Sequence, residues 1–287
     1  MSDDNDETTR AWNGVLFDKW VRFKHLLTAG LADHGLALMA RQPPEPGSRV
    51  LDLGCGFGDT TQKLAEKLGP RGEAVGVDIA QNFIDASARD ASEAGVSNAR
   101  FVRADIQVDD LGGPFDAAYA RFGMQFVAAP VAALRNVRRA LRPGAPLAFV
   151  TWRKREDNAW LHVPELCVRD FIPEEEETAD EPTCGPGPFA MRSADLVSDQ
   201  LRAGGYRDIT FQRHDVDICI GRTLDEALDF SLALGPSGEI IRLAGDYGQK
   251  RLPEIMDAMR TALSGFVTDK GVFAPSSSWL ITARVPS

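Results

Sequence analysis

The sequence has 287 residues, a length that allows one large domain or one domain with a substantial insertion. Its net charge of −10 argues against broad nucleic-acid binding, which needs clustered lysine and arginine. It has no apolar run of about 18 residues, so no membrane span is predicted. The polar, acidic segment 1–10 has no apolar core typical of an export signal. We therefore expect a cytoplasmic protein with reduced cysteines.

Residues 1–9 are expected to be disordered, and a single domain is expected over 10–287. Apolar side chains from Trp12 to Leu31 recur at spacings of three and four, which predicts an amphipathic helix. Strand and helix patterns then alternate, which predicts a parallel sheet with helices on both faces. The expected strands are 49–53, 74–78, 99–104, 115–120 and 146–152. The expected helices between them are 60–68, 81–94 and 131–141.

The alternation ends after Trp152. Residues 153–192 are expected to be irregular, with a solvated acidic loop at 174–177. A helix over 193–203 and two extended runs, 209–213 and 216–220, come next. Helices over 224–234 and about 239–266 would form a cap, and a last strand over 278–285 would return to the sheet.

A glycine-rich turn, Gly54-Cys55-Gly56-Phe57-Gly58, joins the first predicted strand to the helix after it. Glycines at such a turn let the backbone approach a ligand closely. The spacing differs from the dinucleotide fingerprint, in which the third glycine comes one residue later. An acid, Asp52, directly precedes the turn, and it would repel a pyrophosphate. The turn therefore favours a ligand that carries positive charge.

Three successive predicted strands end in an aspartate: Asp52, Asp78 and Asp105. Ligands of open α/β sheets bind at the carboxyl ends of the strands. Asp78 also follows Gly58 by 20 residues, the spacing at which a carboxylate meets ribose hydroxyls. Each aspartate alone has an alternative interpretation as a strand-end or helix-capping residue. A ligand that combines adenosine, an ammonium and a sulfonium would offset the mutual repulsion of all three.

The chain resembles the class I S-adenosylmethionine-dependent methyltransferases through the segment 50–58, Gly76-Val77-Asp78 and Ala104-Asp105. It is also similar to their type 11 branch, which includes ubiquinone and menaquinone biosynthesis enzymes, through Leu141-Arg142-Pro143-Gly144-Ala145. The resemblance implies a Rossmann-like, doubly wound, mostly parallel seven-stranded sheet with N-terminal lid helices and a C-terminal helical cap. Residues 10–152 would then hold the lid and cofactor-binding core, 153–277 the substrate cap and remaining sheet elements, and 278–287 the final strand.

The same resemblance implies that S-adenosylmethionine is the cofactor. It assigns cofactor binding to residues of the lid, the glycine turn and the strand ends: Trp12, Trp20, Asp52, Gly54, Gly56, Gly58, Asp78, Ile79, Ala104, Asp105, Ile106 and Arg121. Among these, Asp52 would face the ammonium, Asp78 the ribose hydroxyls and Asp105 the adenine amino group. An alternative for Trp12 and Trp20 is that they are core aromatics.

Methyl transfer is an in-line displacement at an already activated carbon, so alignment and exclusion of water can suffice. If the acceptor must lose a proton, His162 is the best placed of the four histidines to act as a base; the alternative is a packing histidine. No metal cluster is predicted. The expected acceptor side follows the fourth and fifth strands and consists of Phe122, Met124, Gln125, Phe126, Trp152, Asn158 and Trp160. These residues could equally belong to the core.

The predicted function is methyl transfer to a small or medium, partly hydrophobic molecule. Two alternatives stay open: a nicotinamide-dependent oxidoreductase, and a non-catalytic protein that binds S-adenosylmethionine. The sequence does not name the acceptor or decide between O-, N-, C- and S-methylation. A monomer or a homodimer is expected.

Overall fold

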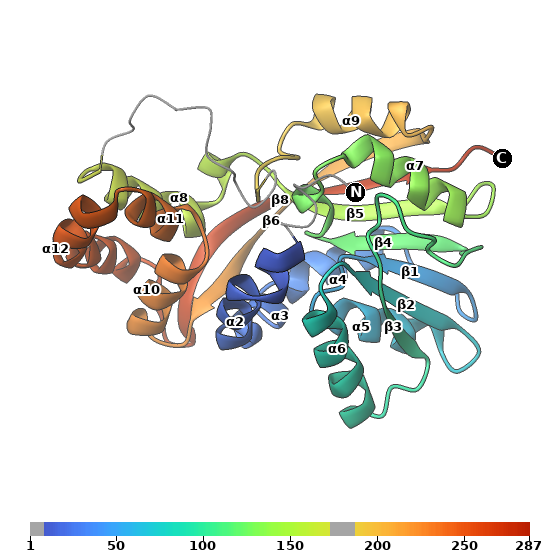
Figure 1. The fold of residues 1–287 in the computed structure, drawn as a ribbon, viewed down its shortest axis with the longest axis horizontal. Coiled ribbons are helices and arrows are strands. Elements are labelled where there is room, and N and C mark those ends of the chain that lie inside the picture. The colour runs from blue at the N-terminus through green and yellow to red at the C-terminus, as the bar shows by residue number, and fades with distance from the viewer. Residues whose placement is uncertain (1–8, 173–186) are drawn as a thin grey trace.

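The computed structural model describes residues 9–172 and 187–287, which form one mixed sheet with helices on both faces (Figure 1). The strand order is β3-β2-β1-β4-β5-β8-β6. The two strands β6 and β8 are antiparallel to their neighbours, and the first five strands are parallel. The bounds are β1 (Arg49–Leu53), β2 (Glu73–Asp78), β3 (Ala99–Arg103), β4 (Ala117–Arg121), β5 (Pro146–Trp152), β6 (Arg207–Gly221), β7 (Val267–Thr268) and β8 (Gly271–Arg284).

The predicted doubly wound, mostly parallel sheet is confirmed, and β7 is a two-residue addition that pairs with β8. The predicted acidic loop at 174–177 lies outside the described residues, as do residues 1–8 of the expected disordered segment 1–9; Thr9 is helical, contrary to that expectation.

Helices cover both faces because successive side chains in each strand point to opposite sides. Val50 belongs to a core shared with α4 (Ala32–Arg41) and α5 (Asp59–Leu68). Its neighbour Leu51 belongs to a second core with α7 (Pro130–Ala140) and α9 (Ala194–Ala203). A further helix, α6 (Gln81–Glu93), packs on β2 and β3. The sheet is thus buried on both faces, and its strand ends are left to form a site.

The N-terminal segment forms several short helices rather than one. Residues 9–13 are helical, and α2 (Val15–Arg22) and α3 (Lys24–Thr28) follow. The break at Phe23 turns its ring into the core, where it packs edge-on against Phe230 with ring centroids 5.3 Å apart. We refer to residues 9–31 as the lid, because they lie across the carboxyl ends of the strands.

The C-terminal half of the chain forms a helical cap made of α8 (Ala159–Arg169), α10 (Leu224–Ala233), α11 (Pro236–Leu243) and α12 (Gly245–Ser264). The strand β8 pairs with β5 only over Ser278–Arg284, yet its pairing with β6 extends to Val272. The paired strands therefore project beyond the sheet and carry the cap (Figure 1). None of the helices in the described ranges is both long and apolar enough to cross a membrane.

Four expected boundaries in this half were wrong. Helix α8 occupies part of the segment expected to be irregular, since Pro164 inside it resembles a helix break in the sequence. The two extended runs form the single strand β6, and β8 begins at Gly271 rather than at 278. The long helix expected at 239–266 is two helices, because Gly245 adopts a φ of 53° between them.

A buried histidine ties α4 to β8. The Nδ1 and Nε2 atoms of His34 each lie 2.9 Å from a serine hydroxyl, those of Ser278 and Ser276 respectively. Because Ser276 donates its own proton to the carbonyl of Val216, it must accept from Nε2 of His34. The imidazole is therefore neutral with its proton on Nε2. Burial lowers the pKa of His34 to about 3.

We predict that the NMR signals of His34 show no titration between pH 8 and pH 5, because protonation would leave a second buried N–H facing a hydroxyl that already donates to it. The measurement is a ¹H–¹⁵N spectrum of the imidazole rings across this pH range, with His34→Gln used to assign the signals. A midpoint near 6.5 for His34 would contradict the assignment.

Candidate functional site

A cavity lies at the carboxyl ends of β1, β2 and β4, under the lid. This is the point where the strand order reverses between β1 and β4. Eleven of the twelve predicted cofactor-binding residues line the cavity, namely Trp12, Trp20, Asp52, Gly54, Gly56, Asp78, Ile79, Ala104, Asp105, Ile106 and Arg121. The sequence therefore predicted residues that the fold brings together in one cavity. Their roles in cofactor binding are proposals.

The glycine turn is shaped by close backbone contact. Gly54 and Gly56 adopt φ values of 64° and 53°, which favour glycine. A Cβ atom on Gly54 would lie 2.9 Å from the Cα atom of Gly123, in the turn after β4. The two turns thus touch through their backbones.

Gly58, the twelfth predicted residue, does not line the cavity. A Cβ atom there would lie 2.6 Å from the ring of Phe101 and 2.8 Å from the side chain of Ser87. Its φ of 74° ends the turn and starts α5. The structure thus gives Gly58 a packing role.

Asp52 carries an unsatisfied buried oxygen. Its Oδ2 atom accepts a hydrogen bond of 2.6 Å from Thr61, but Oδ1 is buried and has no hydrogen-bond partner. Burial raises the pKa of this carboxyl to about 7, an effect that the Thr61 hydrogen bond opposes. A buried acceptor without a partner is costly, so the position is suited to a ligand that donates a hydrogen bond or carries positive charge.

Asp78 connects the second strand end to the turn. Its carboxylate accepts from the backbone N–H of Gly56 at 3.1 Å and of Ala80 at 3.0 Å. Burial raises its pKa, and these backbone hydrogen bonds partly offset the rise. Each oxygen retains accepting capacity toward the cavity, as a ligand with hydroxyl groups would require.

The third acidic residue at the strand ends, Asp105, accepts hydrogen bonds from a neighbouring residue. One of its oxygens accepts from both the backbone and side-chain nitrogens of Gln107. Ile79 and Ile106 also line the cavity and offer apolar contacts. Parallel strands are about 4.8 Å apart, so Asp105, Asp78 and Asp52 span about 10 Å of the sheet edge.

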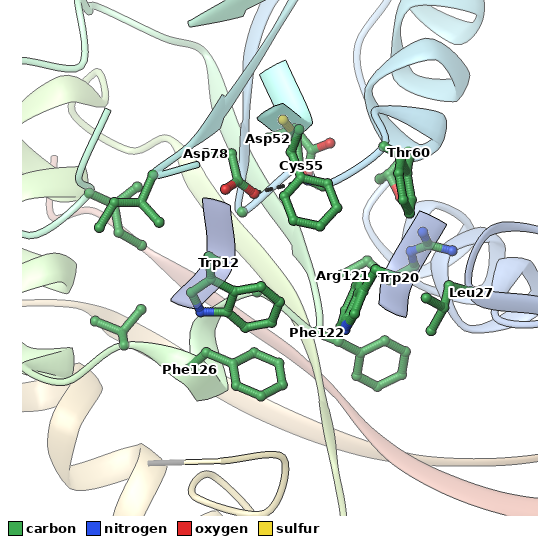
Figure 2. A pocket seen from close by; sticks show the side chains of 18 of the residues that line it. Trp12, Trp20, Leu27, Asp52, Cys55, Thr60, Asp78, Arg121, Phe122 and Phe126 are labelled. Atoms are coloured by element: carbon green, nitrogen blue, oxygen red, sulfur yellow. Dashed lines mark hydrogen bonds between the residues drawn. The ribbon is translucent and has the colours of Figure 1, made fainter. Parts of the chain in front are cut away.

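Arg121 lines the cavity on the side away from Asp78. Its guanidinium donates to Asp59 at 2.7 Å and to the backbone carbonyl of Thr28, in the lid, at 3.2 Å. The arginine thereby links β4, the start of α5 and the lid. Figure 2 shows it beside Trp20 and Leu27, away from Asp78 and Trp12.

The lid contributes an aromatic wall. Trp12 packs edge-on against Trp20 and Phe126, with centroid separations of 5.3 and 5.4 Å. Both tryptophans contact Phe83 of α6 as well. Trp12 and Trp20 thus line the cavity, as expected of lid residues, and also belong to an aromatic cluster, as expected of core residues.

The predicted acceptor residues lie mostly behind the cavity wall. Phe122 and Phe126 line the cavity, whereas none of Met124, Gln125, Trp152, Asn158 and Trp160 does. Gln125 accepts from the backbone of Trp152 at 3.3 Å, and Asn158 holds the backbone of Ser277. Met124 is fully buried. The short helix after β4, Met124–Phe126, buries Met124 and Gln125 and leaves Phe126 at the cavity.

The predicted base, His162, lies in α8 of the cap and does not line the cavity. Among the cavity-lining residues that the structure describes, the ionisable groups are Asp52, Cys55, Asp59, Asp78, Asp105 and Arg121. Burial raises the pKa of the Cys55 thiol well above its usual value, so it is not a thiolate. No cluster of metal ligands occurs within residues 9–172 and 187–287.

Several lining residues were missed from the sequence. They are Leu27, Thr28, Leu31, Phe57, Asp59, Thr60, Phe83, Gln107, Gly123, Val127 and Ala128. Leu27 and Leu31 belong to the apolar stripe noticed in the N-terminal segment, which shows that this stripe faces the cavity in part. Phe57 lies within the glycine turn, Asp59 and Thr60 begin α5, and Phe83 lies in α6. The remaining positions lie in the lid and in the segments after β3 and β4, where no local pattern predicts which residues face the cavity.

Residues 50–144 match the family model described as "Methyltransferase domain". A ubiquinone/menaquinone biosynthesis C-methyltransferase UbiE from Ectopseudomonas mendocina is 37% identical over 130 residues, which are 45% of this chain and 51% of that protein. The segment 50–144 thus has the sequence of a methyltransferase domain. A demethylmenaquinone methyltransferase of Listeria monocytogenes is 27% identical over 130 residues, which are 45% of this chain and 55% of that protein. The chain spans about half the length of the curated relatives it matches.

Solved methyltransferase-like structures agree on the fold. The YcgJ protein of Bacillus subtilis superimposes with a TM-score of 0.56 at 19% identity, over 89% of this chain and 99% of that one. A phosphoethanolamine N-methyltransferase of Haemonchus contortus, bound to S-adenosylhomocysteine, gives a TM-score of 0.57 at 14% identity, over 100% of this chain and 61% of that one. At these identities the likeness supports the methyltransferase fold alone.

The chemistry of the cavity lining fits S-adenosylmethionine, the cofactor that the resemblance implies. The unpartnered oxygen of Asp52 would receive the ammonium, and the Asp78 carboxylate the ribose hydroxyls. The turn at Gly54 and Gly56 leaves room for close approach. These residues would hold S-adenosylmethionine.

We predict that the affinity for S-adenosylhomocysteine rises about tenfold from pH 6 to pH 8. The pKa of Asp52 is about 7, so the carboxyl is mostly protonated at pH 6 and mostly ionised at pH 8, and only the ionised form attracts an ammonium. Isothermal titration calorimetry in buffers of different ionisation enthalpy would measure both the affinity and the proton released. The Asp52→Asn variant should lose this pH dependence, whereas a flat profile in the unmodified protein would contradict it.

Proposed function

We propose that this chain transfers the methyl group of S-adenosylmethionine to an apolar acceptor built on a flat, hydroxylated ring, of the hydroquinone type. The observation that carries the proposal is the cavity itself, whose lining combines the carboxylates of Asp52 and Asp78 with an aromatic and aliphatic wall that includes Trp12, Phe122 and Phe126. The names of the sequence relatives, which refer to ubiquinone and menaquinone biosynthesis and to demethylmenaquinone, support this acceptor class.

When bound, S-adenosylmethionine supplies a methyl carbon already activated by the sulfonium, so the protein need not provide an electrophile. The chain's own residues hold the cofactor in one orientation, and the lid excludes water. A new bond forms between the acceptor and the methyl carbon as the carbon–sulfur bond breaks. The sulfur keeps the electron pair, and the acceptor's proton leaves to solvent.

The described part of the cavity lining contains no histidine, lysine or tyrosine. Apart from Arg121 and Cys55, the ionisable groups of the lining are carboxyls. A hydroquinone hydroxyl has the pKa of a phenol, about 10, so its proton is held less tightly than that of an aliphatic alcohol, and this favours it as the acceptor. His162 stays a sequence-based prediction without a place in the cavity.

The oxidoreductase alternative is disfavoured by the buried carboxyl of Asp52, which would face a pyrophosphate with like charge once ionised. An experiment distinguishes the proposed methyl transfer from the alternative of a non-catalytic protein that only binds S-adenosylmethionine. We expect methyl transfer from labelled S-adenosylmethionine to a reduced, short-chain demethylmenaquinone analogue, measured by mass spectrometry of the extracted ring. Cofactor binding without transfer to a panel of hydroquinones, phenols and amines would overturn the proposed function.

We predict that Asp78→Ala weakens S-adenosylhomocysteine binding by about 1–3 kcal/mol, the scale of lost charged hydrogen bonds. The carboxylate also orders the backbone of Gly56, so the loss includes a contribution from the turn. The Asp78→Asn variant keeps an acceptor for the Ala80 N–H and is expected to bind with intermediate affinity. Calorimetry of all three proteins, with circular dichroism to check folding, would measure this. An unchanged affinity for Asp78→Ala would exclude the ribose contact.

A further inference from the structure

Phe122, the residue after β4, lines the cavity in an unusual backbone conformation. Its φ is 59°, in the left-handed region that large side chains rarely adopt. A strained aromatic residue at a site needs a structural reason. The reason begins with Gly123, which lies so close to β1 that a Cβ atom there would be 2.6 Å from the carbonyl oxygen of Leu53. The chain must turn at this point, and the turn directs the ring of Phe122 toward the cavity.

The ring of Phe122 is held by a second aromatic residue. Trp152, at the end of β5, stacks on it with a centroid separation of 3.8 Å and an interplanar angle of 18°. The edge of His34 contacts both rings, at 5.3 Å from Phe122 and 5.1 Å from Trp152. Because Trp152 covers one face of Phe122, an entering molecule meets the opposite face or the edge.

Trp152 is itself fixed from behind. Its backbone N–H donates to Gln125 at 3.3 Å, and its ring packs against Trp160 of the cap at 5.3 Å. Trp160 in turn stacks on Phe230 of α10, at 6.0 Å. All of these side chains are buried. A continuous row of rings therefore runs from the cavity wall into the cap.

The position of Phe122 in the sheet separates it from the proposed adenosine contacts. In the strand order β3-β2-β1-β4, Asp105 and Asp78 lie on one side of Asp52, and Phe122 lies on the other. Figure 2 shows its ring on the side of Arg121 and Leu27, whereas Phe126 lies beside Trp12. The part of the cavity at Phe122 is thus the part that an adenosyl group bound at Asp78 leaves open.

We infer that Phe122 is the specificity-determining wall of the acceptor subsite, that it recognises a flat aromatic ring, and that Trp152 is the residue that positions it. This inference rests on the proposed function, since it assigns the acceptor's place in the same cavity. It explains why two residues predicted to touch the acceptor, Trp152 and Trp160, are found behind the wall: they act through Phe122.

The test measures binding of two inert probes to the protein loaded with S-adenosylhomocysteine, by calorimetry. The probes are 2-naphthol and its saturated counterpart decahydro-2-naphthol, which share the hydroxyl group and carbon skeleton but differ in aromaticity. We expect the unmodified protein to prefer 2-naphthol. Phe122→Leu should weaken 2-naphthol binding about 2- to 10-fold, the range of an aromatic contact, and should abolish the preference.

Matched variants separate positioning from folding. Trp152→Leu should reduce the preference as Phe122→Leu does, whereas Trp152→Phe, which retains a ring for stacking, should restore it. Phe126→Leu changes an aromatic wall residue on the other side of the cavity and should leave the preference intact. Retained binding of S-adenosylhomocysteine by Phe122→Leu and Trp152→Leu, within about twofold, confirms that the cofactor part of the site is folded.

The outcomes are distinct. A preference for 2-naphthol that persists in Phe122→Leu, or the absence of any preference in the unmodified protein, overturns the inference. The inference is supported if the preference is lost in Phe122→Leu and Trp152→Leu but kept in Phe126→Leu and Trp152→Phe. If that result holds but no hydroxylated ring is methylated, the proposed function fails and the ring-binding wall stands.

Discussion

The site depends on the direct contact between two backbone turns, one after β1 and one after β4. Gly54 and Gly123 are so close that neither position has space for a side chain. Because these strands are neighbours at the reversal of strand order, the contact brings Asp52 and Phe122 to the two sides of one narrow opening. A side chain at either glycine would separate the turns, and the carboxylates and the aromatic wall would no longer share a cavity.

This arrangement leaves the protein with a buried carboxyl that only half satisfies its hydrogen-bonding capacity. Thr61 bonds one oxygen of Asp52, and the other has no partner. Burial and the nearby acids Asp59 and Asp78 all disfavour the charge, which Arg121 partly offsets. Such a group destabilises the unliganded state, and a ligand with an ammonium relieves the cost. The burial that raises the pKa of Asp52 thus also makes its position suited to an ammonium group.

The sequence predicted well which residues line the cavity at the ends of β1, β2 and β3, because the ends of parallel strands are local in sequence and converge in space. Once the strands at Asp52 and Asp78 are recognised, the sheet itself brings their carboxylates together. The acceptor part could not be predicted in the same way. Whether Gln125 or Phe122 faces the cavity depends on the strained φ angle of Phe122, directly after β4. No residue pattern in the sequence predicts this angle. The same holds for the fold. The five parallel strands were predicted, whereas α8 was not, because Pro164 inside it resembles a helix break.

The acceptor side also draws on segments outside the family's shared region. The matching segment, 50–144, ends before β5, so Trp152 and the cap lie beyond it. The lid is fixed to the cap rather than only to the cofactor core, since Phe23 packs on Phe230, and His25 contacts Glu226 at 3.0 Å. It is fixed to the core as well, because the backbone N–H of Asn82 donates to Asn13 at 3.2 Å. A change in the cap can therefore alter the cavity both through the lid and through the rings behind Phe122, while the carboxylates at the strand ends stay in place. This separation explains physically how one cofactor site can serve relatives with different acceptors.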